Sequence, residues 1–316
     1  MDSAVASEKT ASHGLSRLVT VDEPVTPERW LENRAREVCR DLESGHIVFL
    51  PHTPIDLPLK DRALLLDRKQ SSSAYHKNIA YRPLEDRVTG LDRSEEQEAE
   101  ELRAVLADYS KRSLEFLKIF LAPYAGKWKL EFASFRPIEE QGRAARLHAR
   151  NDLLHFDSFP TRPTNGARIL RFFTNINPAQ NRVWLTSETF EAFGPRMVKR
   201  ASLTSSLNNP VRRSLHALAR VLHLPGWSRP PYDDWMQRCH NTMKEDANFQ
   251  ENTPKNRWEF PPNSSWMVFT DCVSHAVLSG RYALEQTLLV PPSALIEPER
   301  SPLAILESVI GRRLTV

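Results

Sequence analysis

The stretch Arg168-Ile-Leu-Arg-Phe-Phe-Thr-Asn-Ile-Asn177 decides the fold of this chain. It is rich in β-branched and aromatic residues and is closed by Pro178, a pattern typical of a buried β-strand. Several short strand-like runs form a second block over residues 257–290. The segments between the two blocks are helical or irregular: 187–199, 211–222 and 231–247. Strands in two separated blocks, with helices before and between them, predict a mixed α and β protein built on a β-sandwich or jelly roll.

The first half of the chain adds helices and further strands to this core. Thr26-Pro27 has the form of a helix N-terminus, and apolar residues at helical spacing follow as far as Gly45, which ends the helix. A short apolar strand is predicted at 46–51 and an alternating strand at 128–136. Between these two strands, a capping box and apolar residues at i, i+3 and i+4 spacing predict a long helix over 94–121.

Composition excludes several classes of protein. The chain has 316 residues, of which 40% are hydrophobic and 26% are charged, so it is neither fibrous nor wholly disordered. Lys and Arg total 43 against 40 Asp and Glu, and the net charge of +3 is too small for a protein that binds nucleic acid through phosphate contacts. The three cysteines have no metal-site spacing and are odd in number, which argues against a disulfide framework and indicates a reducing compartment. Glycine-rich phosphate-binding motifs are absent from the sequence.

The termini and the apolar runs bear on domain organisation and location. Residues 1–24 have no apolar periodicity, and we expect them to form a disordered tail. Residues 25–316 are then expected to form a single domain with a helical insert around 187–250. No apolar run approaches the length of a membrane-spanning helix, and the first twenty residues lack the apolar centre of a signal peptide. The protein is therefore expected to be cytoplasmic.

The stretch Asn151-Asp-Leu-Leu-His155-Phe156-Asp157-Ser158-Phe159 is the most informative for chemistry. In a strand, residues i and i+2 point to the same face, so His155 and Asp157 can bind one metal ion together. Non-haem Fe(II) oxygenases bind iron with two histidines and one carboxylate, and here the third ligand has to come from a distant strand. His275, in the apolar run Asp271-Cys-Val-Ser-His-Ala-Val-Leu-Ser-Gly280, is the candidate for it.

Other interpretations of these residues stay open at this point. An isolated H-x-D pair is common on protein surfaces, and His155 or His275 could be a core histidine with one hydrogen bond. His240 lies beside Cys239 but has no partners at ligand spacing. A Ser-His-Asp hydrolase is compatible with the composition, although no G-x-S-x-G motif marks a reactive serine.

Three longer motifs occur along the chain: H-F-D-S-F-P-x-R-P-x-x-G-x-R-I-L-R-x-F-x-N-I-N-P at 155–178, H-N-x-M-K-x-D-x-x-F-Q at 240–250 and W-x-V-F-T-D-x-V-S-H-A-V-L-S-G-x-Y-A-L-E-Q-T at 266–287. In this order they resemble the Kdo 3-hydroxylases. These are Fe(II)/2-oxoglutarate-dependent dioxygenases acting on the 3-deoxy-D-manno-oct-2-ulosonic acid (Kdo) of bacterial lipopolysaccharide. The resemblance covers about residues 25–295. It implies a double-stranded β-helix, a form of jelly roll, surrounded by helices.

The resemblance makes His155, Asp157 and His275 the iron ligands. It implies that 2-oxoglutarate chelates the iron through its keto group and one carboxylate, and that dioxygen takes a remaining position. The implied reaction replaces a C–H bond at C3 of a Kdo residue by C–OH, and so converts Kdo to D-glycero-D-talo-oct-2-ulosonic acid. The protein holds the ligands and the substrate in place while the cofactor carries the chemistry.

The distal carboxylate of 2-oxoglutarate needs a cation, usually an arginine that binds it through two hydrogen bonds. In many relatives this arginine lies about ten residues beyond the distal histidine, but this sequence has Glu285 at that place and only Arg281 nearby. Arg168 and Arg171 are therefore competitors. They lie three positions apart on one predicted strand and so face opposite sides of it, and we favour Arg171.

The substrate that the resemblance implies is a Kdo-containing lipid A glycolipid at the inner face of the cytoplasmic membrane. Lys244, Arg257 and Trp258 are candidates for contacts with it. A basic segment over 195–231, which includes Trp227 and almost no acidic residues, is expected to make a peripheral contact with anionic head groups. Two alternatives stay open: a 2-oxoglutarate oxygenase that acts on another small polar substrate, and a non-catalytic jelly-roll binding module.

Overall fold

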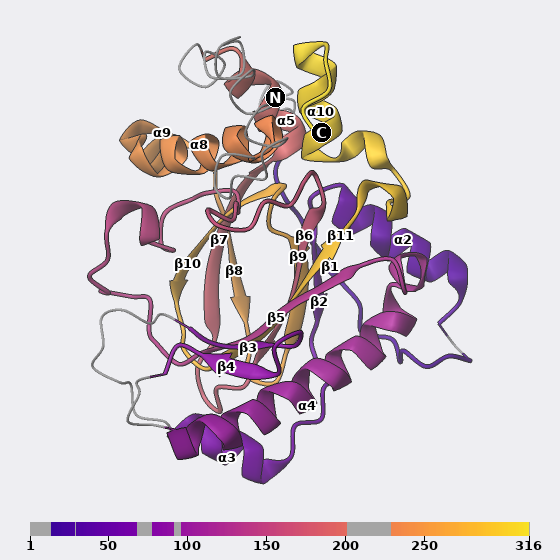
Figure 1. Ribbon diagram of the computed structural model, residues 1–316, viewed down its shortest axis with the longest axis vertical. Helices are drawn as coiled ribbons and strands as arrows, with labels where there is room; N and C mark the ends of the chain where they lie inside the picture. Colours follow the sequence, from indigo (N-terminus) through magenta and orange to yellow (C-terminus); the bar gives the residue numbers. More distant parts are fainter. Residues whose placement is uncertain (1–13, 29, 68–77, 92–95, 201–228, 316) are drawn as a thin grey trace, which may run out of the picture.

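The structure is a computed structural model that describes residues 14–28, 30–67, 78–91, 96–200 and 229–315. Two β-sheets lie at its centre with helices around them (Figure 1). Within the described ranges, the large sheet has eight strands in this spatial order: β1 (Leu18–Thr20), β2 (Ile47–Leu50), β9 (Ser265–Phe269), β6 (Arg168–Asn175), β11 (Ala283–Val290), β5 (Lys129–Arg136), β3 (Ile79–Arg82) and β4 (Arg87–Thr89). In the same part of the chain, the small sheet has three: β10 (Val273–Ser279), β7 (Arg182–Thr189) and β8 (Asn256–Phe260).

Strand pairing agrees with the predicted jelly roll. In the large sheet, β11 pairs antiparallel with both β5 and β6, and β6 pairs antiparallel with β9. In the small sheet, β7 pairs antiparallel with both β10 and β8. Two antiparallel sheets that pack face to face and exchange consecutive strands form a jelly roll. The predicted strands at 168–177 and over 257–290 therefore supply both sheets, as expected.

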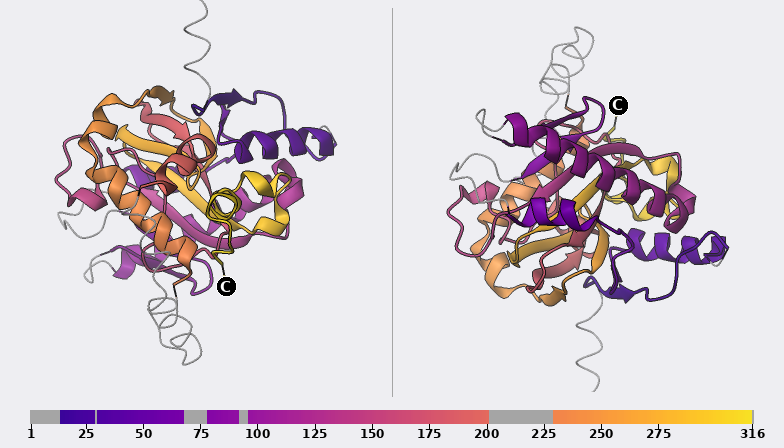
Figure 2. Two further views of the ribbon diagram at one scale, coloured as in Figure 1. Left: turned by 90° about the horizontal axis from the view of Figure 1, so that it is seen from above. Right: turned by 90° about the horizontal axis from the view of Figure 1, so that it is seen from below.

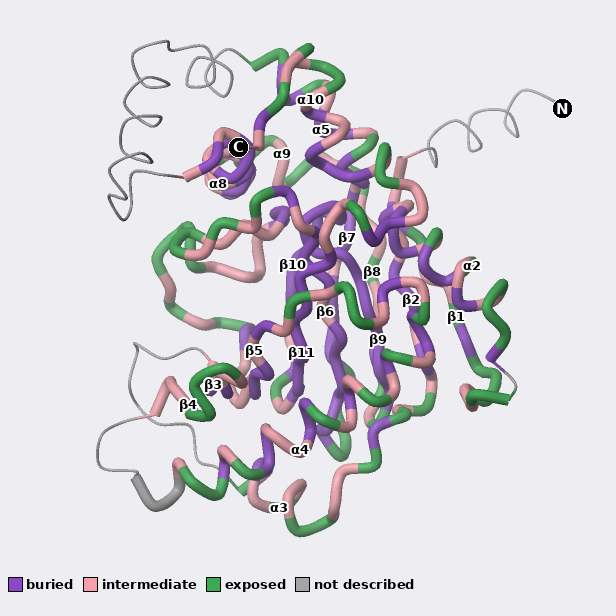
Figure 3. Tube along the Cα trace, turned by 45° about the vertical axis from the view of Figure 1, so that its right-hand side comes forward, coloured by how far each residue is buried: buried purple, intermediate pink, exposed green. Residues whose placement is uncertain are grey.

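Aromatic side chains between the two sheets hold them together. Trp266 of β9 stacks on Phe173 of β6 at 5.1 Å and on Phe260 of β8 at 4.0 Å, measured between ring centroids. Trp184 of β7 meets Trp266 edge to face at 5.8 Å. All four rings are buried, and Figure 3 shows that the central strands of both sheets are coloured largely as buried. Such contacts stabilise a core beyond the apolar area that they bury, and the sheets are thereby fixed on either side of any site between them.

Helices cover the sheets. The α-helices in the described residues are α2 (Glu32–Glu43), α3 (Leu59–Asp67), α4 (Glu96–Phe120), α5 (Phe190–Val198), α8 (Pro231–Glu245), α9 (Ala247–Asn252) and α10 (Pro302–Ile310). Short 3₁₀ turns lie at η1 (Ala122–Tyr124), η2 (Leu147–Ala149), η3 (Pro292–Ala294) and η4 (Pro298–Arg300). Figure 2 shows from above that α8 and α10 lie over one end of the strands. At the other end α3 and α4 lie next to β3 and β4 (Figure 1).

Strand β7 and the start of helix α2 differ from the prediction, each for a local reason. Strand β7 was not predicted, because it is buried on both faces and carries polar residues such as Arg182 and Thr186 at inward positions. Its sequence therefore lacks the alternation that marks a strand with one wet face. The first predicted helix begins at Glu32 and not after Thr26, because Thr26–Trp30 closes a single turn and Leu31 is extended.

The predicted N-terminal tail over residues 1–24 is wrong for the part that the structure describes. Leu18–Thr20 forms strand β1, which pairs in parallel with β2 at the edge of the large sheet. Val21 is 2% exposed and so belongs to the core. The contact is made by backbone hydrogen bonds over three residues, and a strand this short has no periodicity that a sequence could display. Residues 1–13 lie outside the described part of the chain.

Candidate active site

His155 and His275 face each other across a short bridge between the H-x-D segment and strand β10. The backbone N–H of His155 donates to the carbonyl of His275 at 3.1 Å, and the N–H of His275 donates to the carbonyl of His155 at 3.0 Å. This pairing sets the two imidazole rings 4.6 Å apart between centroids. Residues 120 positions apart are thus brought together by sheet pairing, as the jelly-roll prediction requires.

The nitrogens of both rings are oriented for a common ligand. Nδ1 of His155 lies 2.7 Å from the carbonyl of Leu153, and Nδ1 of His275 lies 2.9 Å from the carbonyl of Val273. Each Nδ1 therefore carries the proton, which leaves the Nε2 lone pair available. Nε2 of His155 lies 3.6 Å from Oδ1 of Asp157. One ligand atom from each of His155, Asp157 and His275 lies within 4.8 Å of the others, a spacing that suits a single metal ion.

The charge states of the three side chains also suit a divalent metal. Burial lowers the pKa of His155 well below its ordinary value and lowers the pKa of His275 as well, so both rings are neutral. Burial on its own raises the pKa of Asp157, but Arg171 and the contact with His155 outweigh it and hold that pKa well below its ordinary value. Two neutral imidazoles and one carboxylate are the donor set of non-haem Fe(II) oxygenases. The predicted iron ligands are therefore together and correctly protonated.

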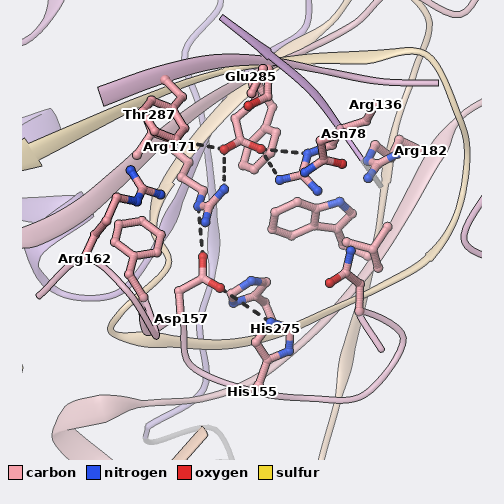
Figure 4. A pocket seen from close by; sticks show the side chains of 18 residues that line it. Asn78, Arg136, His155, Asp157, Arg162, Arg171, Arg182, His275, Glu285 and Thr287 are labelled. Atoms are coloured by element: carbon pink, nitrogen blue, oxygen red, sulfur yellow. Dashed lines mark hydrogen bonds and ion pairs between the residues drawn. The ribbon is translucent and has the colours of Figure 1, made fainter. Parts of the chain in front are cut away.

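A cavity of about 280 Å³ opens beside these side chains (Figure 4). Its wall carries four arginines and two carboxylates: Arg136, Arg162, Arg171, Arg182, Asp157 and Glu285. Aromatic rings from both sheets complete it, among them Phe132, Phe159 and Trp184. A site with an excess of guanidinium groups suits ligands that carry carboxylates.

Arg171 of β6 pairs both with Asp157 and with Glu285 on the neighbouring strand β11 of the large sheet. Its Nε lies 2.9 Å from Oδ2 of Asp157, and its Nη1 forms an ion pair with Glu285. Glu285 is also paired with Arg136 and accepts a hydrogen bond from Thr287 at 2.8 Å. Burial on its own raises the pKa of Glu285, but Arg136 and Arg171 lower it to about 2, so this glutamate is ionised. Two protein carboxylates, Asp157 and Glu285, therefore neutralise the positive charge of Arg171.

The other two arginines expected at the 2-oxoglutarate site lie elsewhere. Arg168 is fully buried on the opposite face of β6, where its Nε donates to Oδ2 of Asp271 at 2.8 Å and its guanidinium covers the ring of Phe269. Arg281 stacks over Tyr282 and does not line the cavity. The opposite orientations of Arg168 and Arg171 follow from the two-residue period of a strand.

Arg182 and Trp184 line the cavity and were not identified in the sequence. Both side chains are 1% exposed. Nη1 of Arg182 donates to the carbonyl of Gly280 at 2.6 Å, but its Nε and the Nε1 of Trp184 have no hydrogen-bond partner among the described residues. Burial and the nearby Arg136 lower the pKa of Arg182 to about 10. Unsatisfied buried donors are costly, and both residues line the cavity.

Helices α8 and α9 of the helical insert form hydrogen bonds with the backbone of the H-x-D segment. His240 of α8 lies with Nδ1 2.8 Å from the carbonyl of Phe156. Gln250 of α9 accepts from the N–H of Leu154 at 2.8 Å and donates to its carbonyl at 2.9 Å. The insert therefore binds the backbone on both sides of His155. Both side chains lie in the second motif of the sequence, which was the available signal for this role.

Three candidates for substrate contacts do not line the cavity. Lys244 is buried, its Nζ donates to the carbonyl of His148 at 3.0 Å, and burial lowers its pKa to about 8. Arg257 pairs with Glu259 on the outer strand β8, and Trp258 donates to the hydroxyl of Thr186 at 2.8 Å.

Most of the predicted basic patch over 195–231, including Trp227, lies outside the described residues. Two of its described arginines pair with carboxylates: Arg196 with Glu188 at 2.6 Å and Arg200 with Asp246 at 3.0 Å. Arg229 donates to the carbonyl oxygens of Pro160 and Phe159 and so turns toward the segment after the H-x-D motif. Among the described helices, none combines the length and apolar character needed to cross a bilayer.

Comparisons with known proteins point in one direction. Residues 27–313 match the family model described as 3-deoxy-D-manno-oct-2-ulosonic acid (Kdo) hydroxylase. Among solved structures, the chain is 31% identical to the Kdo hydroxylase KdoO, a non-heme Fe(II) α-ketoglutarate-dependent dioxygenase in complex with α-ketoglutarate and Fe(III). That match covers 95% of this chain and 98% of the other with a TM-score of 0.79.

Two further complexes of KdoO are equally similar. The cobalt(II) complex is 32% identical over 94% of this chain and 97% of the other, with a TM-score of 0.79. The complex with succinate and Fe(III) is 30% identical over the same shares of the two chains, with a TM-score of 0.78. No curated protein matches the sequence.

Proposed function

This chain belongs to the Kdo hydroxylase family of Fe(II)/2-oxoglutarate-dependent dioxygenases, and we propose that it hydroxylates carbon 3 of a Kdo residue in a lipid A glycolipid. Fe(II) and 2-oxoglutarate are its cofactors, and dioxygen is its co-substrate. Carbon 3 is the proposed target because a 3-deoxy sugar carries a CH₂ group there, between the anomeric carbon and a hydroxylated one. The product would be D-glycero-D-talo-oct-2-ulosonic acid.

We assign the iron to His155, Asp157 and His275. The observation that carries this assignment is the donor set: two Nε2 atoms freed by backbone bonds at Nδ1 and one ionised carboxylate, all within 4.8 Å. When bound, iron with 2-oxoglutarate and dioxygen supplies the oxidant that converts C–H to C–OH. The protein's part is to hold the three ligands, and Arg171 fixes the carboxylate of Asp157 through the contact at Oδ2.

We assign the distal carboxylate of 2-oxoglutarate to Arg182, with Arg136 beside it. Arg182 is the better candidate than Arg171 because Arg171 is already neutralised by Asp157 and Glu285, whereas Arg182 pairs with no carboxylate among the described residues. The unpartnered Nε of Arg182 and Nε1 of Trp184 give two donors to a carboxylate in a buried place. Trp184 also stacks on His275 at 5.3 Å and so joins this subsite to the iron ligands.

We propose one catalytic domain for the chain from residue 14 onward, because its strands run from β1 to β11 in two sheets that together enclose the cavity. A lipid-anchored acceptor also requires the enzyme to meet a bilayer surface. We propose a peripheral contact in the cytoplasm through the basic segment 195–231, on the ground of its sequence charge.

Two measurements test the proposed function. Anaerobic addition of Fe(II) and 2-oxoglutarate should give a weak metal-to-ligand charge-transfer absorption in the wild-type protein and none in Asp157→Ala. Aerobic reaction with a Kdo-containing lipid A acceptor should then add one oxygen atom, detected by mass spectrometry. An acceptor with both hydrogens at C3 replaced by deuterium should lose one deuterium in the product. Gain of oxygen with both deuterium atoms retained would place the reaction at another carbon.

A further inference from the structure

Arg162 lies at the edge of the cavity between two aromatic rings. Its guanidinium carbon lies 4.1 Å from the ring centroid of Phe132 and 4.5 Å from that of Phe159. Nη1 of Arg162 forms an ion pair with Glu131, and no described residue accepts a hydrogen bond from its Nε or Nη2. The side chain is 38% exposed. Contacts with two aromatic rings and the ion pair hold the guanidinium in place, while its Nε and Nη2 stay open to a ligand.

Arg162 and Arg182 lie on opposite sides of the iron ligands. Figure 4 shows Arg162 on one side of Asp157 and His275, and Arg182 on the other. The two arginines differ in access, because Arg182 is 1% exposed while Arg162 reaches solvent. A small co-substrate that stays enclosed suits the Arg182 side. A sugar attached to a large carrier has to enter from solvent and therefore suits the Arg162 side.

The cavity keeps a net positive charge when both cofactors are counted, and this charge favours an additional anion. Its wall carries four arginines against two carboxylates, and Glu131 beside it pairs with one of the arginines, Arg162. The two positive charges of Fe(II) and the two negative charges of 2-oxoglutarate cancel each other. A positive excess therefore remains with both cofactors in place, and a buried or half-buried positive excess favours an anionic ligand.

We propose that Arg162, held between Phe132 and Phe159, binds the C1 carboxylate of the Kdo residue and selects an acidic sugar over a neutral one. This rests on the proposed function, which makes a Kdo residue the substrate. The carboxylate lies on the sugar close to carbon 3, so a guanidinium at the cavity edge orients the target carbon toward the iron side. Arg162 is thus a specificity-determining residue for the acceptor and takes no part in binding 2-oxoglutarate.

The chain offers matched variants for a test. In Arg162→Met the stem is kept and the charge is lost, and Glu131 retains a partner because Nζ of Lys129 lies 3.0 Å from it. Arg162→Lys keeps the charge but loses the planar group. Arg82→Met is the control, because Arg82 stacks over the same Phe132 ring at 4.8 Å and pairs with Glu85, yet it does not line the cavity.

The experiment measures equilibrium binding of two acceptors under anaerobic conditions with Fe(II) and 2-oxoglutarate present. One acceptor is a Kdo-containing lipid A, and the other is the same molecule with its Kdo carboxyl groups converted to methyl esters. Wild type and Arg82→Met should bind the acid more tightly than the ester, by roughly 10- to 100-fold, the worth of hydrogen bonds to a charged group. Arg162→Met should bind both equally, and Arg162→Lys should fall between.

Preserved discrimination in Arg162→Met would overturn the proposal. So would loss of the charge-transfer absorption in Arg162→Met at saturating 2-oxoglutarate, because Arg162 would then serve the cofactor and not the sugar. A wild-type protein that shows no such absorption would contradict the proposed iron and 2-oxoglutarate sites themselves. That result is separate, since the acid and the ester can still be compared by binding alone.

Discussion

Nε of Arg171 lies 2.9 Å from Oδ2 of Asp157, on the side of the carboxylate that faces away from His155. The contact leaves Oδ1 directed at the histidine pair and fixes the rotation of the carboxylate. Glu285, on the neighbouring strand β11 of the same sheet, pairs with the same guanidinium. Arg171 thus couples the carboxylate of Asp157 to strand β11. Loss of Arg171 should therefore weaken Fe(II) binding more than 2-oxoglutarate binding.

We expect Arg171→Met to weaken Fe(II) binding about 10- to 100-fold, the usual effect of removing a group that orients a metal ligand. Anaerobic titration with Fe(II) measures it, and Arg82→Met serves as the surface control. If the iron affinity were unchanged and only the 2-oxoglutarate requirement rose, Arg171 would be the cosubstrate arginine and our assignment of Arg182 would be wrong.

Arg182→Met should weaken binding of 2-oxoglutarate while Fe(II) binding stays near wild type. The expected cost is about 2–5 kcal/mol, because a desolvated charged pair loses one partner. Titration of the charge-transfer absorption with 2-oxoglutarate at saturating Fe(II) gives the dissociation constant. Equal dissociation constants for the variant and the wild type would exclude Arg182 from this role.

Asp157→Ala and His275→Ala should each abolish product formation without unfolding the chain. Each removes one of three ligands from the proposed site, while the aromatic core between the sheets does not depend on metal. Product is measured by mass spectrometry of the acceptor, and folding by thermal unfolding of the metal-free protein. Turnover in either variant would remove that residue from the ligand set.

Gln250→Leu should lower both stability and iron affinity. It leaves the N–H and the carbonyl of Leu154 without their partner, at a cost of about 1–3 kcal/mol for a buried unsatisfied group. Because Leu154 precedes His155, the ligand also loses its support, and Fe(II) titration should show weaker binding. Asn252→Ala is the control, since Asn252 lies on the same helix and its side chain bonds, among the described residues, only to the exposed Asn248. Similar iron affinities for the two variants would mean that the insert supports the fold alone.

The metal-free protein should lose stability as the pH falls below about 6.5, the ordinary pKa of histidine. His155, His240 and His275 have pKa values lowered by burial, that of His240 to about 4. Below pH 6.5 these histidines bind protons in the unfolded chain but stay neutral in the folded chain. Each histidine therefore lowers the free energy of unfolding by about 1.4 kcal/mol per pH unit until the pH reaches its folded-state pKa. Urea unfolding at several pH values measures the slope. His240→Asn should reduce the slope of the unfolding free energy against pH by the contribution of one histidine, about 1.4 kcal/mol per pH unit. An unchanged slope would show that His240 is not held neutral.

The sequence by itself determined the class of fold and predicted the three side chains that we assign to the iron. The strand at 168–177 and the strands over 257–290 were predicted from apolar runs with turn residues at their ends, which are local features. His155 and Asp157 were linked by the two-residue period of a strand, and His275 was the candidate for the third ligand because it lies in an apolar, strand-like run. Opposite orientations for Arg168 and Arg171 followed from the same period, and the structure has them so.

Only the tertiary structure decided which cation is free to bind a ligand. Glu285 and Asp157 neutralise Arg171, and neither contact can be seen in the sequence. Glu285 lies on β11, far along the chain, and Asp157 lies in a segment outside the sheets whose position only the fold fixes. Arg182 was not predicted as a site residue, because the polar inward residues of β7 remove the apolar–polar alternation by which a strand is identified. The edge strand β1 was hidden for a related reason, because its pairing is made by the backbone and depends on where β2 lies. Charge type and strand period are properties of a short stretch of sequence, whereas pairing and access are properties of neighbours that the fold alone brings together.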